Sequence, residues 1–137
     1  MSFAGLNYLA VVIAAAASFA LGAAWYGALG KRWMAAARVS EADLATEGFA
    51  ARLPYVVAAV CQLVMAFMLA GVLGHLGRVD FAGGLIAALS LWLGFVVTSM
   101  AVNHRFQNRS WALTAVDGGY WLAAMLLQGA IIGGFGI

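Results

Sequence analysis

Charged residues are scarce in this sequence. Asp, Glu, Lys and Arg make up 9% of its 137 residues and hydrophobic residues 66%, and mean hydropathy is +0.99. An average soluble domain carries about 25% charged residues. The deficit excludes water as the main solvent of the chain. We therefore expect an all-α integral membrane protein that forms one domain over residues 1–137, with membrane lipid around it.

Cysteine and histidine are also rare. The single cysteine, Cys61, excludes an internal disulfide and a cysteine-cluster metal site, and its apolar context indicates a small buried hydrophobe. His75 and His104 fall near opposite membrane faces, so they cannot share a metal or a haem. The sequence also lacks the HExxH, GxSxG and P-loop patterns. We expect no metal and no other cofactor, and a non-enzymatic role is favoured.

Long apolar runs dominate what is present. A helix needs about 20 apolar residues to cross the hydrocarbon core of a bilayer, and four runs of that length recur between short polar stretches. They cover about residues 7–29, 54–76, 83–103 and 111–135. The pattern predicts a bundle of four transmembrane helices, with Pro54 placed where a first helical turn tolerates proline.

The longest connection carries a helix signal of its own. Ser40 followed by Asp43 three residues later is a capping box. This motif predicts a short helix over about residues 41–50. Leu44 and Phe49 would lie on one side and charged residues on another, which favours a cytoplasmic, interfacial position.

Lys and Arg are distributed unevenly among the connections. The first carries Lys31, Arg32, Arg38 and Arg52, the third carries Arg105 and Arg109, and the second carries only Arg78. Positive charge accumulates on the cytoplasmic side of membrane proteins. We therefore expect the first and third connections inside and both termini outside, in a bacterial inner (plasma) membrane. As topology signals, these residues do not indicate a nucleic-acid partner, despite the net charge of +2.

Small residues recur at spacings that let helices approach closely in lipid. The predicted helix-packing glycines are Gly22, Gly27, Gly118, Gly119, Gly129 and Gly133. Four short helices rarely enclose a pathway alone, so a homo-oligomer formed through glycine-rich faces of spans one or four is expected. Gln62 and Gln128 lie deeper and are expected to hydrogen-bond between helices.

Asp117 is the one acidic residue inside a predicted span. A carboxylate there costs about 2.5 to 3.5 kcal/mol on insertion scales, so it should face the bundle interior and have a partner. The residues expected to form a polar site with it are Trp25, Tyr26, Asn103, His104, Arg105 and Tyr120. Two interpretations remain open: a structural tie that fixes helix register, and a proton-accepting or cation-binding carboxylate that faces the cytoplasm.

Three segments carry a family resemblance. They are GAAWYGALGKRWM at residues 22–34, NHR at residues 103–105 and DGGY at residues 117–120. With four spans in a chain of this length, they resemble the bacterial membrane family catalogued as domain of unknown function 1761. The resemblance covers nearly the whole chain. It implies the four-helix fold and no catalytic residues.

Three functions compete at this point. The leading one is a homo-oligomeric, transporter-like or channel-like protein whose polar site around Asp117 opens to the cytoplasm. An alternative is a non-catalytic accessory or scaffold subunit for an unidentified membrane partner, which would contact the segment from Ser40 to Phe49. The third is a small intramembrane enzyme that acts on a lipid or quinone.

Overall fold

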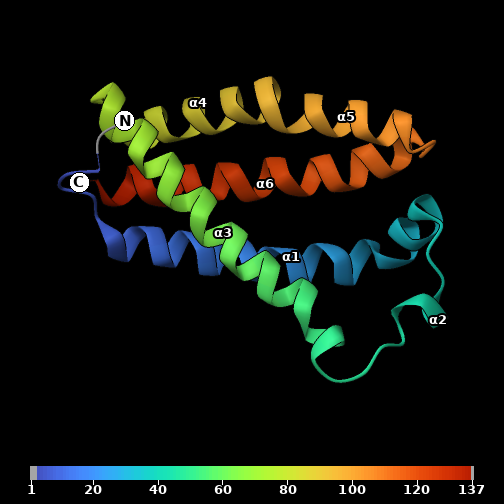
Figure 1. Ribbon diagram of the computed structural model, residues 1–137. Helices are drawn as coiled ribbons and strands as arrows, with labels where there is room; N and C mark the ends of the chain where they lie inside the picture. The colour runs from blue at the N-terminus through green and yellow to red at the C-terminus, as the bar shows by residue number, and fades with distance from the viewer. Residues whose placement is uncertain (1–2, 137) are drawn as a thin grey trace.

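The computed structural model describes residues 3–136, and that part of the chain forms four long helical rods that run back and forth (Figure 1). The elements are α1 Tyr8–Ala37, α2 Glu41–Leu44, α3 Phe49–Leu76, α4 Phe81–Leu91, the π-helical turn η1 Trp92–Val96, α5 Val97–Phe106 and α6 Trp111–Phe135. α4, η1 and α5 form one continuous rod. Each rod is long and apolar enough to cross a membrane. The predicted all-α fold with four membrane-length helices is confirmed.

Helix α6 occupies the centre of the bundle although it comes last in the chain. It packs mainly against α1 and α4, and it also contacts α3 and α5 (Figure 1). Small side chains let these helices approach closely. The fully buried alanines of the core are Ala10, Ala14, Ala66, Ala88 and Ala124.

Helix α3 crosses the bundle obliquely and packs only through its second half. Its buried residues run from Gln62 to Leu73, and none of residues 49–61 is buried. Its first half diverges from α6 toward the side of α2 (Figure 1). Cys61 lies on this half and is exposed, so its interpretation as a buried hydrophobe was wrong. The bundle is therefore less covered at the end where α6 begins.

Two helix boundaries differ from those expected. α1 continues to Ala37 rather than ending near residue 29, so its 30 residues are about 45 Å long against a lipid core of about 30 Å. α3 begins at Phe49, which places Pro54 inside the helix. Hydropathy marks where lipid ends, and both helices continue past that point into polar sequence. The fourth span has the expected bounds, Trp111 to Phe135.

The third span is longer than expected and contains an irregularity. It runs over residues 81–106, and its middle widens into the π-helical turn η1. Such turns arise as single insertions within α-helices and often lie at functional sites. Here the turn lies beside α6.

The helix expected over residues 41–50 is only one turn long. α2 ends at Leu44, and Phe49 already belongs to α3. The predicted capping box is confirmed: the Ser40 hydroxyl accepts from the Asp43 backbone N–H, and Asp43 accepts from the Ser40 backbone N–H. Leu44 and Phe49 are both exposed. Because nothing packs on its apolar side, the cap alone does not extend the helix.

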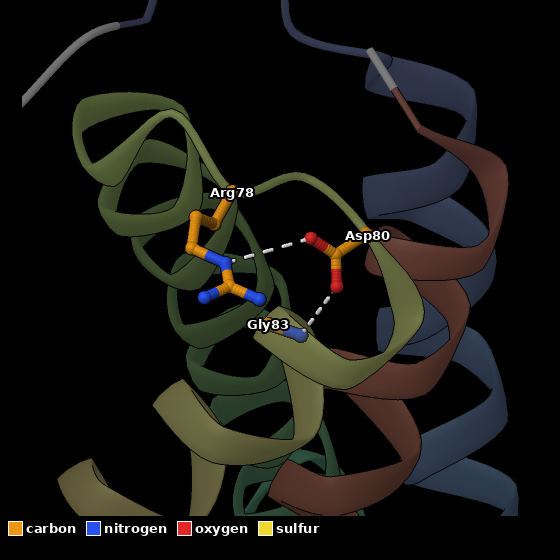
Figure 2. A network of polar contacts seen from close by, with 3 residues as sticks. All are labelled: Arg78, Asp80 and Gly83. Atoms are coloured by element: carbon orange, nitrogen blue, oxygen red, sulfur yellow. Dashed lines mark hydrogen bonds and ion pairs between the residues drawn. The ribbon is translucent and has the colours of Figure 1, made fainter.

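The turn between α3 and α4 is held by a side-chain cap (Figure 2). Asp80 accepts a hydrogen bond of 2.7 Å from the Gly83 backbone N–H, and its other oxygen lies 3.7 Å from Nε of Arg78. The cap satisfies an N–H group at the start of α4 that would otherwise have no partner. α4 thus begins at a fixed place, opposite the last turn of α6.

Candidate functional site

The hydrogen-bond partner of Asp117 lies on α1. The Tyr26 hydroxyl donates a hydrogen bond of 2.6 Å to Oδ1 of Asp117, and both side chains are partly exposed. Asp117 lies about 9 Å along α6 from its first residue, at the end where α3 has diverged. A neutral donor therefore satisfies the carboxyl group without neutralising it, and one side of the pair remains accessible.

Two indole groups fix the backbone on either side of Asp117. Trp25 donates through Nε1 to the carbonyl of Val116 at 3.1 Å, and Trp92 donates through Nε1 to the carbonyl of Gly118 at 2.9 Å. Trp25 comes from α1, and Trp92 is the first residue of η1. These bonds hold α6 at one rotation between its neighbours, so the direction in which Asp117 points is set in advance.

Each glycine of the Asp-Gly-Gly-Tyr segment faces a different neighbour. A Cβ on Gly119 would lie 3.0 Å from Cζ2 of Trp25, and one on Gly118 would lie 3.5 Å from Cγ2 of Val97. Gly22 of α1 in turn leaves room for the Tyr120 hydroxyl, which a Cβ there would meet at 2.9 Å. These glycines let α1 and α5 approach α6 on both sides of the carboxylate.

A second polar cluster, the central knot, lies deeper in the bundle. It consists of Ser18, Gln62, Tyr120 and Gln128, which are between 0% and 5% exposed. The Ser18 hydroxyl lies 2.8 Å from Oε1 of Gln62 and 2.8 Å from Nε2 of Gln128. Tyr120 accepts from Nε2 of Gln62 and donates to the Ser18 carbonyl at 2.9 Å. The knot joins α1, α3 and α6 and closes the centre of the bundle.

The role expected for Gln62 and Gln128 is confirmed, because they hydrogen-bond across helices in this knot. Sequence reasoning missed the part played by Ser18. The available signal was its position as the one hydroxyl within an alanine-rich run. Such a residue in lipid needs an acceptor, and its own helix supplies two in the carbonyls of Ala14 and Ala15.

Of the other predicted site residues, His104 and Arg105 form a separate group at the start of α6, and Asn103 lies at the surface. Nη2 of Arg105 lies 2.9 Å from the Thr114 hydroxyl, and Nδ1 of His104 lies 2.8 Å from the same oxygen. The Arg105 guanidinium also stacks on Trp111, 3.7 Å from the ring centroid. Asn103 is exposed and does not join either group. Arg105 therefore anchors the start of α6, whereas the hydroxyl of Tyr26 holds the carboxylate.

The predicted packing glycines of α6 are already used within the chain. A Cβ on Gly129 would overlap the Gly84 carbonyl, and one on Gly133 would overlap the Asp80 carbonyl. Both contacts are with the segment that begins α4. Gly27 has open space around it, so it does not serve helix packing within one chain. A glycine-rich face that remains available for a second copy lies on α1, not on α6.

Two open grooves lie away from Asp117. One lies between α3 and α4 and has a volume of about 260 Å³, and the other lies between α1 and α3 with about 390 Å³. Their linings are almost wholly apolar, as expected of grooves that lipid chains fill. Within residues 3–136, no three His, Cys, Asp or Glu side chains come together as metal ligands.

Asp117 can accept a proton, bind a cation at its accessible side, or tie α1 to α6. The first two need a path to the carboxylate, which its partial exposure provides. The hydrogen bond from Tyr26 already provides the tie between α1 and α6. Asp117 is therefore an acidic group of fixed orientation near one end of the bundle, and the central knot lies deeper inside.

Comparison with known proteins supplies a family and no activity. Searches among curated proteins and among solved structures gave no significant match. The sequence model of one family, described as protein of unknown function (DUF1761), matches residues 9–133. That match spans all four membrane-length helices and the polar residues described above. The chain belongs to the DUF1761 family.

Proposed function

We propose that the protein is a homo-oligomeric, transporter-like membrane protein in which Asp117 takes up a proton or another monovalent cation from the cytoplasmic side. The observation that carries the proposal is the pairing of Asp117 with a neutral hydroxyl. The one ion pair in the described part of the chain joins Arg78 to Asp80. An intramembrane carboxylate that keeps its charge available is a group that binds and releases cations.

The translocation path lies between protomers in this proposal. The central knot argues for that placement, because its four side chains are bonded to one another and almost wholly buried, so they close the centre of one bundle. Two surfaces are available for a second copy: the face of α1 around Gly27, and the diverging half of α3. Both lie at the same end of the bundle as Asp117.

The orientation in this proposal follows from the distribution of basic residues. The connections that carry Lys31, Arg32 and Arg105 face the cytoplasm, and the termini face the opposite side, in a bacterial inner membrane. α1 extends through Lys31 and Arg32 to Ala37, so these charges extend beyond the lipid core. Asp117 then faces the cytoplasm.

Flux through proteoliposomes tests the proposal. Purified protein is reconstituted with an internal pH-sensitive dye, and proton movement is followed after a pH step with the membrane potential clamped. Asp117→Asn is expected to abolish the protein-dependent flux. Asp80→Asn is the matched control, since asparagine also caps helices well and Asp80 lies at the other end of the bundle. Equal flux in wild type and Asp117→Asn, or none in either, would overturn the proposal.

An accessory role is the second candidate, and the central knot is the observation that favours it. A rigid, closed bundle suits a subunit that stabilises a membrane partner. The exposed turn α2 and the start of α3 would provide the contact. Purification from native membranes under mild detergent tests this role. A stoichiometric partner lost on replacement of Ser40 to Gly48 by a flexible linker supports it, and recovery of the homo-oligomer alone contradicts it.

A further inference from the structure

Aromatic rings gather around Asp117. The Tyr26 ring lies edge-on to Trp33, with centroids 6.2 Å apart, and 5.4 Å from the Tyr120 ring. Tyr120 in turn lies 6.5 Å from Trp25 and 4.9 Å from Trp121. These five residues, which we call the aromatic cluster, form a continuous series of rings on α1 and α6. Three of the five tryptophans of the chain belong to it.

The aromatic cluster is accessible from one side. Tyr120 is buried, whereas Trp25, Tyr26, Trp33 and Trp121 are partly exposed, as is Asp117 itself. Three of these four exposed members come from α1, near its cytoplasmic end in the proposed orientation. A ligand can therefore reach the carboxylate along the surface of α1, at the level where the lipid core meets the headgroups, without entering the central knot.

The side-chain oxygen atoms at this site are too few to surround a metal cation. Mg²⁺ and Ca²⁺ take six or more oxygen ligands, and no group of three potential metal-ligating side chains exists in residues 3–136. The site offers one carboxylate and the Tyr26 hydroxyl. A cation that enters here must do without a full shell of oxygen atoms.

An organic cation meets that condition. When the charge is spread over a carbon skeleton, the ion is weakly hydrated, and aromatic faces attract it through their quadrupoles. The carboxylate supplies the opposite charge, and the surrounding rings supply apolar contact area. The neighbouring basic groups are engaged elsewhere. Arg105 is held against Trp111 and Thr114, and His104 contacts the Thr114 hydroxyl, so neither forms an ion pair with Asp117.

We propose that the Asp117 site binds lipophilic organic monovalent cations, with the carboxylate as counter-charge and the aromatic cluster as the contact surface. This inference rests on the proposed function, because it names the substrate class of the same site. Metal cations, unlike the proton of the proposed function, are not ligands of this site.

Binding of tetraphenylphosphonium to the purified, detergent-solubilised full-length protein tests the inference. Saturable binding is measured by equilibrium dialysis and by quenching of tryptophan fluorescence. Asp117→Asn is expected to weaken binding at least tenfold, and Asp117→Glu to retain most of it. Rubidium and calcium ions at millimolar concentration are expected not to compete. Circular dichroism and gel filtration establish that each variant is folded.

The aromatic contribution is tested with substitutions inside and outside the aromatic cluster. Trp33→Leu is expected to weaken binding about two- to fivefold, the range of a cation–π contact at a partly exposed site, and Trp33→Phe to restore most of it. Phe106→Leu is the matched control, because Phe106 is an aromatic residue that is 90% exposed and lies outside the aromatic cluster. Its binding is expected to equal that of wild type.

Three results overturn the inference: no saturable binding, binding unchanged in Asp117→Asn, or competition by rubidium or calcium. The proposed function is judged separately by proton flux. If Asp117-dependent flux persists while tetraphenylphosphonium neither binds nor inhibits it, the substrate class is wrong and the proton-accepting role stands. If flux is absent altogether, the proposed function itself fails.

Discussion

Gly84 of α4 and Gly129 of α6 contact each other through their backbones. A Cβ on either residue would overlap the carbonyl group of the other. One helical turn further on, Gly133 makes a similar contact with the Asp80 carbonyl. In lipid, where no hydrophobic driving force brings helices together, such close approach is a main source of association. The α4–α6 contact therefore depends on these three positions having no side chain.

Gly84→Ala and Gly129→Ala are each expected to destabilise the bundle by about 1 to 3 kcal/mol, the usual cost of overpacking. The new methyl group meets backbone rather than a movable side chain, so α4 and α6 must separate. Thermal unfolding in detergent, followed by circular dichroism, measures the loss.

Gly27→Ala is the matched control for these variants. Gly27 lies inside α1, away from the helix ends, with open space around it, and alanine favours a helix interior over glycine by about 0.5 to 1 kcal/mol. The monomer is expected to be as stable or slightly more stable. If Gly84→Ala is as well tolerated as Gly27→Ala, the close contact does not hold the bundle together.

Removing a single hydroxyl oxygen from the central knot is expected to destabilise the bundle. Tyr120→Phe leaves the Gln62 amide and the Ser18 carbonyl without their partner. Interhelical hydrogen bonds in membranes average about 0.6 kcal/mol, and a buried group left unpaired costs about 1 to 3 kcal/mol. We expect a loss of about 0.5 to 2 kcal/mol, measured by unfolding in mixed micelles.

Tyr55→Phe removes the same atom from an exposed side chain, 68% accessible on the diverging half of α3, and should leave stability within about 0.5 kcal/mol of wild type. A knot that merely filled space would make the two variants equivalent. Equal stability of the two would therefore contradict the role given to the hydroxyl of Tyr120.

Helix bounds and caps depend on the order of residues along one helix, and most of them could be predicted from the sequence. The bounds of α6 were correct, because Ser110 caps its first turn and Gly136, with a positive φ, follows its last residue. The end of α1 was placed about eight residues too early, since hydropathy identifies the lipid core and Lys31 and Arg32 continue the helix beyond it. The capping box at Ser40 was correct, but a cap cannot extend a helix that packs against nothing.

The contacts between helices depend on how each helix is rotated about its axis, and these rotations could not be predicted from the sequence. Depth placed Tyr26 and Arg105 equally well beside Asp117, and only the relative rotation of α1 and α6 selects Tyr26. Gly84 was missed as the partner of Gly129, although Gly84 and Ala88 repeat the small-residue spacing that selected the other packing glycines. The π-helical turn also escaped prediction: one extra residue per turn at Trp92 changes no composition, yet it brings the indole to the Gly118 carbonyl.

Asp43 is expected to titrate below the ordinary range of an aspartate. The Ser40 backbone N–H and, secondarily, its hydroxyl lower the pKa of the Asp43 carboxyl group by stabilising the charged form. The sign follows: the cap is fully formed above about pH 4, the value for an unfolded chain, and is lost as pH falls through the lower pKa of the folded state. Carbon-detected NMR titration of Asp43 measures the value.

Ser40→Ala removes the hydroxyl and keeps the backbone donor, so part of the pKa depression of Asp43 should remain. Ser40→Pro removes both donors, and the pKa of Asp43 is expected to return to the range of an unfolded chain. An unchanged titration in Ser40→Pro would show that something other than the capping box stabilises the carboxylate.

The proposed membrane orientation predicts which connections are accessible from outside the cell, and cysteine labelling tests this prediction. Cys61 is exposed, so Cys61→Ala should fold normally and provide a cysteine-free background. Single cysteines are then placed at exposed positions on each side, as Thr46→Cys, Gln107→Cys and Ala82→Cys. In the proposed orientation the basic connections face the cytoplasm, so a membrane-impermeant maleimide added to intact cells with a permeabilised outer layer should label only Ala82→Cys. The other two should react after the inner membrane is opened. Labelling of Gln107→Cys from outside would reverse the orientation and put Asp117 near the external face.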